Sequence, residues 1–214
     1  MMNTREKMIR SAIILSLFAF VGTGLLSFTH DATSDKIAQN ERNEILHSLH
    51  NIITPGLHDN DIFNDTIEVT DPELLGSSEP VKVYLARKQG KPVGAVFSSI
   101  APNGYNGNIK LLIGVDLDGT LTGVRVIKHL ETPGLGDAIE EQRSDWILKF
   151  KGKSLQDPTE KNWKVKKDKG YFDQFTGATI TPRAIVKAVR NTLLYYKAHK
   201  QQLFAGTGKT TPDE

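Results

Sequence analysis

The residues best suited to chemistry in this sequence lie near its C-terminal end, in the stretch Phe175-Thr-Gly-Ala-Thr-Ile-Thr-Pro182. After this stretch, apolar side chains recur at the helical period, at Ile185, Val186, Val189, Leu193 and Tyr196. We therefore expect a helix whose first residue is Pro182 and whose cap is Thr181. A helix N-terminus presents free N–H groups and partial positive charge, and Gly177 and Ala178 let the backbone approach a ligand closely. The stretch predicts a phosphate site, with an ordinary helix cap after a turn as the alternative.

A second stretch of interest, His129-Leu-Glu-Thr-Pro-Gly-Leu-Gly136, follows a predicted strand. Its glycines and proline indicate a loop with unusual backbone dihedral angles. Its polar residues lie at the mouth of that strand, where binding residues are often found. On the residues alone, a connecting loop remains the simpler interpretation.

Together these stretches resemble the hallmarks of a known family, the FMN-binding domain of ion-pumping membrane redox complexes. Thr176-Gly-Ala-Thr179, followed by Ile180-Thr181 and preceded by Asp173, is similar to the flavinylation motif of that family. Glu131-Thr-Pro-Gly-Leu-Gly136 resembles its second hallmark, and Gly104-Tyr-Asn-Gly107 resembles a third. The resemblance covers about residues 81–197.

This resemblance implies where a cofactor is held. In the family, the last threonine of the tetrapeptide forms a phosphoester with FMN, which here would be Thr179. The other expected FMN-binding residues are Thr176, Gly177 and Ala178 of the same motif, and Glu131, Thr132, Leu135 and Gly136 of the loop that borders the flavin. A separate flavin transferase, which uses FAD and magnesium, modifies members of the family. We therefore expect no catalytic residue in this chain. The spacing of His47 and His50, with His58 nearby, could bind a metal, but no carboxylate pattern surrounds them, so we expect solvated histidines and no bound metal.

The length, the single predicted anchor and the motif set look most like the G-subunit family of Rnf-type (also called Rsx) electron-transport complexes. Such a complex couples electron flow between ferredoxin and NAD to ion movement across the membrane. The resemblance implies an electron relay through covalent FMN, with the other membrane subunits of the complex as partners. The C subunit of the sodium-translocating NADH:quinone reductase shares the flavinylated domain, is generally longer, and stays as an alternative.

Another stretch, Val115-Asp-Leu-Asp-Gly-Thr-Leu-Thr122, resembles the first motif of the haloacid-dehalogenase-type phosphatases. In that family Asp116 would attack phosphorus and Asp118 would handle the proton of the leaving group, with magnesium between them. An alternating strand follows here in place of a helix, and Asp-Gly between two strands is a common signal for a tight hairpin, which we favour. An exported magnesium-dependent phosphatase and a scaffold subunit without redox chemistry remain alternative functions.

The elements that must position these residues are mainly strands. Residues 81–87 and 92–98 form one predicted pair, and residues 109–115 and 121–129 form another. No strand–helix repeat is present, so the predicted class is α+β, an antiparallel sheet with flanking helices. One such helix is expected over residues 138–150, with Trp146, Ile147 and Phe150 on its buried side.

The N-terminal region contains a predicted membrane span. Residues 11–28 carry no charged side chain, and a helix of that length spans roughly 27 Å, near the hydrocarbon thickness of a bilayer. Basic residues precede it and acidic residues follow it, namely Arg5, Lys7 and Arg10 before, Asp31 and Asp35 after. The positive-inside rule predicts a single-pass protein with its N-terminus in the cytoplasm and the rest of the chain outside. The resemblance to Rnf-type subunits implies that the membrane is the bacterial inner membrane and that the main domain is periplasmic. A cleaved signal peptide is the alternative, but no convincing cleavage site follows.

The predicted organisation has five parts. They are a cytoplasmic N-terminus over 1–10, a transmembrane helix over 11–28, a membrane-proximal segment over 29–80, an FMN-binding domain over 81–200 and a mobile tail over 201–214. Within the membrane-proximal segment, a separate amphipathic helix is expected to begin near Ser34, and a loose region is expected after Thr54-Pro-Gly56.

Composition excludes several classes of function. The sequence has no cysteine, which rules out disulfides, cysteine-ligated zinc and cysteine-ligated iron–sulfur clusters. An electron carrier with this sequence therefore needs an organic cofactor. The net charge is only +2, and no lysine-arginine run is interleaved with aromatic residues, so nucleic acid is not an expected partner.

Overall fold

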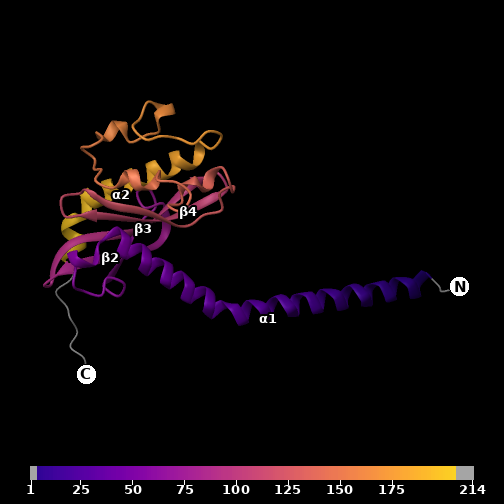
Figure 1. The fold of residues 1–214 in the computed structure, drawn as a ribbon. Coiled ribbons are helices and arrows are strands. Elements are labelled where there is room, and N and C mark those ends of the chain that lie inside the picture. Colours follow the sequence, from indigo (N-terminus) through magenta and orange to yellow (C-terminus); the bar gives the residue numbers. More distant parts are fainter. Residues whose placement is uncertain (1–3, 206–214) are drawn as a thin grey trace, which may run out of the picture. The chain divides into compact units, whose positions relative to one another are not determined.

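The computed structural model describes residues 4–205, which form two compact units divided between Glu44 and Ile45 (Figure 1). The first unit, residues 4–44, is entirely helical and belongs to α1, Thr4–Ile52. Its large apolar side chains are exposed, for example Leu15 at 69% and Phe20 at 80%. Helix α1 is the one described helix that is long and apolar enough to cross a membrane.

Helix α1 corrects the prediction of a separate helix that begins near Ser34. The helix continues without a break from Thr4 to Ile52. The Ser34 hydroxyl donates a hydrogen bond to the carbonyl oxygen of Asp31 at 3.0 Å, so it bonds back into the helix and caps nothing. The first strong helix breaker after the apolar stretch is Pro55, which follows the end of α1.

The second unit is built on a five-stranded antiparallel sheet whose strands follow one another in chain order. The strands are β1 (Thr66–Asp71), β2 (Ser77–Lys88), β3 (Lys91–Gly104), β4 (Gly107–Asp116) and β5 (Leu121–Lys128). The α+β class and the four predicted strands are confirmed. Strand β1 was not predicted and corrects the expectation of a loose region there. None of its six residues is fully buried, and the alternation of their burial is weak, because the strand lies at the edge of the sheet.

One face of the sheet carries the larger core. Helix α2 (Ile180–Ala205) lies along this face and packs against β3 (Figure 1). Its contribution to the core includes Ile185, Val189 and Leu193, which are almost fully buried, as the helical period predicts. The helix extends five residues into the segment predicted as a tail, and residues 206–214 of that segment lie outside the described residues.

The opposite face of the sheet is covered by the end of α1. Leu49, Ile52 and Ile53 form a second buried cluster with strand residues such as Tyr84 and Leu112. Ile52 fits over a glycine of β4: a Cβ atom on Gly114 would lie 2.1 Å from the Ile52 Cγ2 atom. The cross-strand partner of Gly114 is Gly123 on β5, so neither strand offers a side chain at this position.

Residues 136–173 connect the sheet to α2 through short 3-10 helices, which are η2 (Gly136–Ile139), η3 (Ile147–Phe150), η4 (Glu160–Asn162) and η5 (Lys166–Asp168). The predicted helix over 138–150 is therefore wrong. The Ser144 hydroxyl donates to the carbonyl oxygen of Ala138 at 2.6 Å and accepts from the Trp146 N–H at 3.2 Å, which replaces helical bonds with local ones. The burial of Trp146, Ile147 and Phe150 is as predicted.

Candidate functional site

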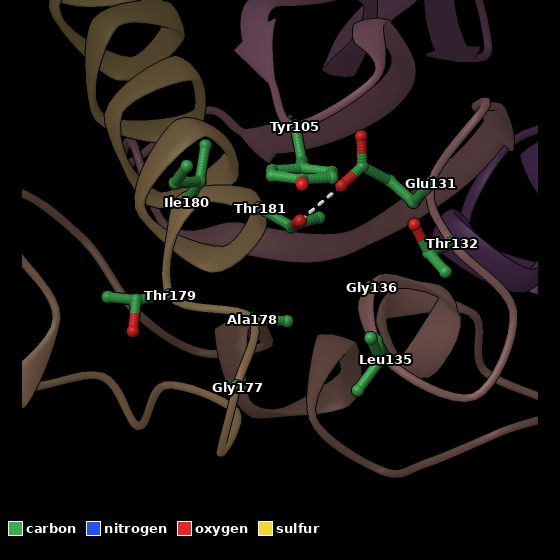
Figure 2. Close-up of a pocket in the computed structure, with 10 residues that line it drawn as sticks. All are labelled: Tyr105, Glu131, Thr132, Leu135, Gly136, Gly177, Ala178, Thr179, Ile180 and Thr181. Carbon is green, nitrogen blue, oxygen red and sulfur yellow. Dashed lines mark hydrogen bonds between the residues drawn. The ribbon is translucent and has the colours of Figure 1, made fainter.

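A cavity of about 290 Å³ lies where three loops meet the start of α2 (Figure 2). The turn between β3 and β4 contributes Tyr105, and the loop after β5 contributes the residues between 131 and 136. The remaining wall comes from the loop before α2 and from the first residues of that helix. The complete lining is Tyr105, Glu131, Thr132, Leu135, Gly136, Gly177, Ala178, Thr179, Ile180 and Thr181.

A buried carboxylate joins these segments. Glu131 is only 5% exposed, and its Oε2 atom accepts a short hydrogen bond from the hydroxyl of Thr181, which is 1% exposed (Figure 2). Its Oε1 atom accepts from the backbone N–H of Asn106 at 3.1 Å. The Asn106 side chain also donates to the Thr132 hydroxyl at 3.3 Å. One carboxylate thus links the β3–β4 turn, the loop after β5 and the first turn of α2.

Two glycines leave room for the Glu131 carboxylate. A Cβ atom on Gly104 would lie 2.3 Å from the carbonyl oxygen of Gly107 and 2.9 Å from Oε1, and a Cβ atom on Gly136 would lie 2.9 Å from Oε2. Real Cβ atoms do not approach so closely, so any side chain at either position would displace the carboxylate. Gly104 and Gly136, which belong to two different hallmarks, therefore both leave space for Glu131.

His129 supports the backbone of this loop. Its Nδ1 atom accepts a hydrogen bond from the Glu131 N–H at 3.0 Å, and its Nε2 atom lies 2.8 Å from a carboxylate oxygen of Glu140. Because Nδ1 must be free to accept, the proton of the ring lies on Nε2, where it is donated to Glu140. The imidazole therefore holds the backbone of Glu131 in place, and it does not itself line the cavity.

Thr179 stands at the start of α2 on the cavity wall. It is half-buried, and its carbonyl oxygen accepts the Arg183 N–H at 3.3 Å, the bond that opens the helix. In Figure 2 its side chain points away from the pair formed by Glu131 and Thr181. The helix begins at Ile180, so the predicted cap by Thr181 is wrong: the Thr181 hydroxyl is committed to Glu131, and Thr179 occupies the capping position.

The loop before Thr179 is fixed at its other end by Asp173. Hydrogen bonds from Lys166 and then Lys149 hold the pKa of the Asp173 carboxyl below its usual value. The carbonyl oxygen of Asp173 accepts the Trp146 indole N–H at 2.8 Å. Gly177 adopts a φ of 79°, a conformation that glycine adopts readily and that turns the loop toward the helix.

The cavity brings together seven of the eight residues predicted to bind FMN. Thr176 is the exception, since it is exposed and does not line the cavity. The sequence prediction missed Tyr105, Ile180 and Thr181. Tyr105 carried a signal, because it belongs to the third hallmark, whereas Thr181 was given a different role and Ile180 carried no signal.

Asp116 and Asp118 lie apart from the cavity, in the turn between β4 and β5. The Oδ1 atom of Asp116 accepts the N–H groups of Asp118 and Thr120, both at 2.9 Å. The carboxylate thus builds the predicted hairpin, and both flanking strands are antiparallel neighbours. Within residues 4–205, no group of three or more histidine or acidic side chains is placed to bind a metal ion.

Comparison with known proteins matches two family models to this chain. The FMN-binding domain matches residues 104–194, and the RnfG N-terminal region matches residues 1–52. The first match contains all three hallmarks and every residue of the cavity lining. The second covers α1 to its last residue.

The relatives share nearly the whole chain. A protein of Shewanella amazonensis is 48% identical over 94% of this chain and 93% of its own length. Proteins of Pseudoalteromonas atlantica and Aliivibrio fischeri are 46% and 45% identical over similar shares. All three are named as the G subunit of an ion-translocating oxidoreductase complex. The chain therefore belongs to the G-subunit family of ion-translocating oxidoreductase complexes.

Proposed function

We propose that this chain is a membrane-anchored flavoprotein subunit that relays electrons within an Rnf-type complex, through FMN attached covalently to Thr179. The observation that carries the proposal is the position of Thr179, at the first residue before a helix of 26 residues and on the wall of a cavity lined by the hallmark residues. The relatives named as complex subunits support the assignment to a complex.

The residues present fit the phosphate end of FMN. A phosphoester on Thr179 would lie at the N-terminus of α2, where free N–H groups and the helix dipole favour negative charge. A diester carries one negative charge, less than the free monoester, and is therefore easier to place there. Gly136 also fits, because the absence of a Cβ atom keeps the cavity open beside Glu131.

The residues also fit the flavin end. Leu135 and Ile180 line the cavity and are 48% and 44% exposed, so they offer apolar surface that a flat aromatic ring would cover. The volume of about 290 Å³ lies at the lower limit for small-molecule sites, about 300 Å³. Part of the cofactor would therefore stay accessible to a neighbouring protein.

FMN supplies transfer of one or two electrons, and the protein supplies position and polarity. Glu131 presents a carboxylate held by Thr181 and Asn106, so its orientation in the cavity wall is fixed. A fixed hydrogen-bonding group beside a flavin sets its reduction potential more reproducibly than a mobile one. The phosphoester itself acts as a tether that prevents loss of the cofactor.

Attachment requires a second protein. The one carboxylate that lines the cavity, Glu131, already accepts the hydroxyl of Thr181, and the Thr179 side chain points away from this pair (Figure 2). Thr179 thus has no base in the cavity lining to activate its weakly nucleophilic hydroxyl. A flavin transferase that uses FAD and magnesium would supply that chemistry, with Thr179 as the acceptor.

The proposed orientation of the chain across the membrane is based on the charge distribution along α1. Its apolar residues 11–28 would cross the inner membrane, the basic residues before them would stay in the cytoplasm, and the FMN-binding domain would lie in the periplasm. A domain outside the cytoplasm cannot readily replace a lost flavin, which gives the covalent tether a purpose.

The proposal is tested by coexpression of the protein with a flavin transferase, followed by denaturing electrophoresis, in-gel flavin fluorescence and intact-mass analysis. We expect one added FMN in the wild type, none in Thr179→Ala, and full labelling of Thr176→Ala and Asp116→Ala. The bare polypeptide mass in the wild type would refute the covalent assignment. Labelling of Thr179→Ala would move the attachment to another residue.

A further inference from the structure

A lysine-rich segment lies next to the cofactor cavity. Residues 149–173, which we call the basic lobe, contain eight lysines and four acidic residues. The lysines are Lys149, Lys151, Lys153, Lys161, Lys164, Lys166, Lys167 and Lys169, and the acidic residues are Asp157, Glu160, Asp168 and Asp173. The lobe therefore has a formal charge of +4, whereas the rest of the chain has a charge of −2.

Two acidic residues hold the charged part of the lobe in a defined arrangement. Asp173 binds Lys166 at 2.6 Å and Lys149 at 3.2 Å. Asp168 binds the guanidinium of Arg183, on the first turn of α2, through bonds of 2.6 and 2.9 Å. Lys149 and Lys166 nevertheless stay more than half exposed, at 56% and 60%.

Of the other lysines of the lobe, Lys153 pairs with Asp157 at 3.3 Å. The remaining five, Lys151, Lys161, Lys164, Lys167 and Lys169, are exposed and form no ion pair within hydrogen-bonding reach of any residue between 4 and 205. The hydrogen bond from Arg183, and then the nearby charges of Lys164 and Lys167, hold the pKa of the Asp168 carboxyl below its usual value. Three of them lie within six residues of one another around the short helix η5. Like charges so close together repel, and an anionic surface placed against them would remove that repulsion.

The lobe borders the wall of the cavity that carries Thr179. Asp173 lies three residues before Thr176, at the start of the cofactor loop. Arg183, the partner of Asp168, donates its backbone N–H to the carbonyl oxygen of Thr179 at 3.3 Å. A protein that docks on the lobe would therefore come to rest beside the cofactor site.

We propose that the basic lobe docks on an acidic surface of a neighbouring subunit of the complex. This rests on the proposed function only in placing the chain inside a complex. A protein surface fits better than anionic lipid, because Asp168 and Asp173 fix a pattern of both signs within the lobe. A fluid layer of lipid headgroups responds mainly to net positive charge, whereas a folded partner can match such a pattern.

The test compares two triple variants in the full complex. The lobe variant carries Lys164→Glu, Lys167→Glu and Lys169→Glu, and the control carries Lys82→Glu, Lys91→Glu and Lys110→Glu on exposed positions of the sheet strands. The measurement is copurification of the variant subunit with the other subunits at rising salt. We expect the lobe variant to be retained about tenfold less than wild type at low salt, and the control to stay near wild type.

Retention of the lobe variant at the wild-type level and with the wild-type salt dependence would overturn the proposal. So would normal copurification together with lost binding to vesicles of phosphatidylglycerol and phosphatidylcholine, which would assign the lobe to the membrane. If circular dichroism shows that the lobe variant does not fold, the corresponding lysine-to-glutamine variant is used, with the same expected direction. Copurification needs no flavin, so it is also measured in Thr179→Ala, which separates failure of docking from failure of the cofactor assignment.

Discussion

At the scale of single residues, the Glu131 carboxylate connects the segments that line the cavity. It accepts hydrogen bonds from Thr181 and Asn106, which lie on separate segments of the chain. A buried carboxylate that loses its donors carries a large desolvation cost, so the surrounding residues are constrained to keep those bonds. The two glycines beside it are part of that constraint.

A methyl group at Gly136 should disturb this arrangement. In Gly136→Ala, the added Cβ would lie 2.9 Å from Oε2 and 3.1 Å from the Thr181 hydroxyl, so the carboxylate must move. We expect the free energy of unfolding to fall by about 1–3 kcal/mol, as for other overpacked sites. Urea denaturation measures it. Gly56→Ala is the matched control, since nothing lies within 4 Å of its Cβ position, and an equal loss there would contradict the explanation.

Tyr196 provides a prediction on pH. Burial, with the nearby Asp116 and Asp118, raises the pKa of the Tyr196 phenol to about 12. The folded state keeps the phenol neutral while an unfolded chain ionises it near pH 10. This contribution to stability is therefore fully present below about pH 10 and is lost as the pH rises toward about 12.

In Tyr196→Phe we expect a smaller loss of stability between pH 8 and pH 11 than in wild type, with residual loss from the other tyrosines of raised pKa, Tyr84 and Tyr195. Near pH 8 the variant should be at least as stable, because the Tyr196 hydroxyl is buried without a hydrogen-bond partner. Urea midpoints at each pH provide the measurement. Parallel decline of the two proteins would show that the pKa of Tyr196 is not raised in the folded state.

The functional residues show what sequence reasoning can reach. The predicted FMN-binding residues were found because their types and order resemble a family, and the cavity gathers all of them except Thr176. The role of Thr181 was wrong because helix propensities describe neighbours along the chain. Its actual partner, Glu131, lies fifty residues away, and no local pattern encodes that contact.

At the scale of elements, the contact between α1 and the sheet depends on an absence of side chains. Gly114 and Gly123 face each other across β4 and β5, and Ile52 lies against both. Their contacts differ in tightness: a Cβ on Gly114 would lie 2.1 Å from Ile52, whereas a Cβ on Gly123 would lie 3.6 Å away. Gly123 therefore serves as the control for a substitution at Gly114.

We expect Gly114→Ala to destabilise the domain by about 1–3 kcal/mol, and Gly123→Ala to have a much smaller effect. Ile52→Ala, which leaves a cavity, should cost about 2–5 kcal/mol. The double variant with Gly114→Ala should be more stable than the sum of the two losses predicts, since the alanine at 52 removes the tighter of two contacts, and only the Thr122 hydroxyl, 2.3 Å from the new Cβ atom, still has to shift. Strict additivity in chemical denaturation would show that Ile52 is not the group displaced.

The elements were predictable to different degrees. Alternating apolar residues and turn glycines identified β2 to β5, because those strands bury one face or both. Strand β1 lies at the edge and carries little pattern, and the segment 138–150 has a helical spacing of apolar residues that the Ser144 side chain interrupts. The prediction of a new helix at Ser34 was wrong because serine is tolerated inside a helix when its hydroxyl bonds back to the backbone.

At the scale of the whole molecule, the second unit begins inside α1 and not after it. Leu49, Ile52 and Ile53 are each at most 3% exposed, so they belong to the core of the sheet domain. We expect a fragment that begins at Ile45 to fold in solution. A fragment that begins at Pro55 loses these three side chains and should be less stable by roughly 5 kcal/mol or more. Circular dichroism and urea denaturation compare the fragments, and equal stability would contradict this boundary.

The boundary also marks a limit of sequence reasoning about domains. The predicted domain began at residue 81, where the strand pattern becomes clear, whereas the compact unit begins at Ile45. Leu49 and Ile52 lie among polar neighbours in the sequence, namely His47, Ser48, His50 and Asn51, and outside any strand pattern. Their partners on β2 to β4 are separated from them by thirty residues or more, so their burial becomes visible only in three dimensions.

The Glu131 linkage has a consequence for how a cell would make the active protein. The carboxylate and its donors Asn106 and Thr181 come together only when the sheet and α2 have closed around them. A nascent chain released from the ribosome would still lack the cavity, although it already contains every motif. An enzyme that recognises the cavity would thus attach the prosthetic group only to folded domains. The attached group would then indicate that the domain has folded correctly.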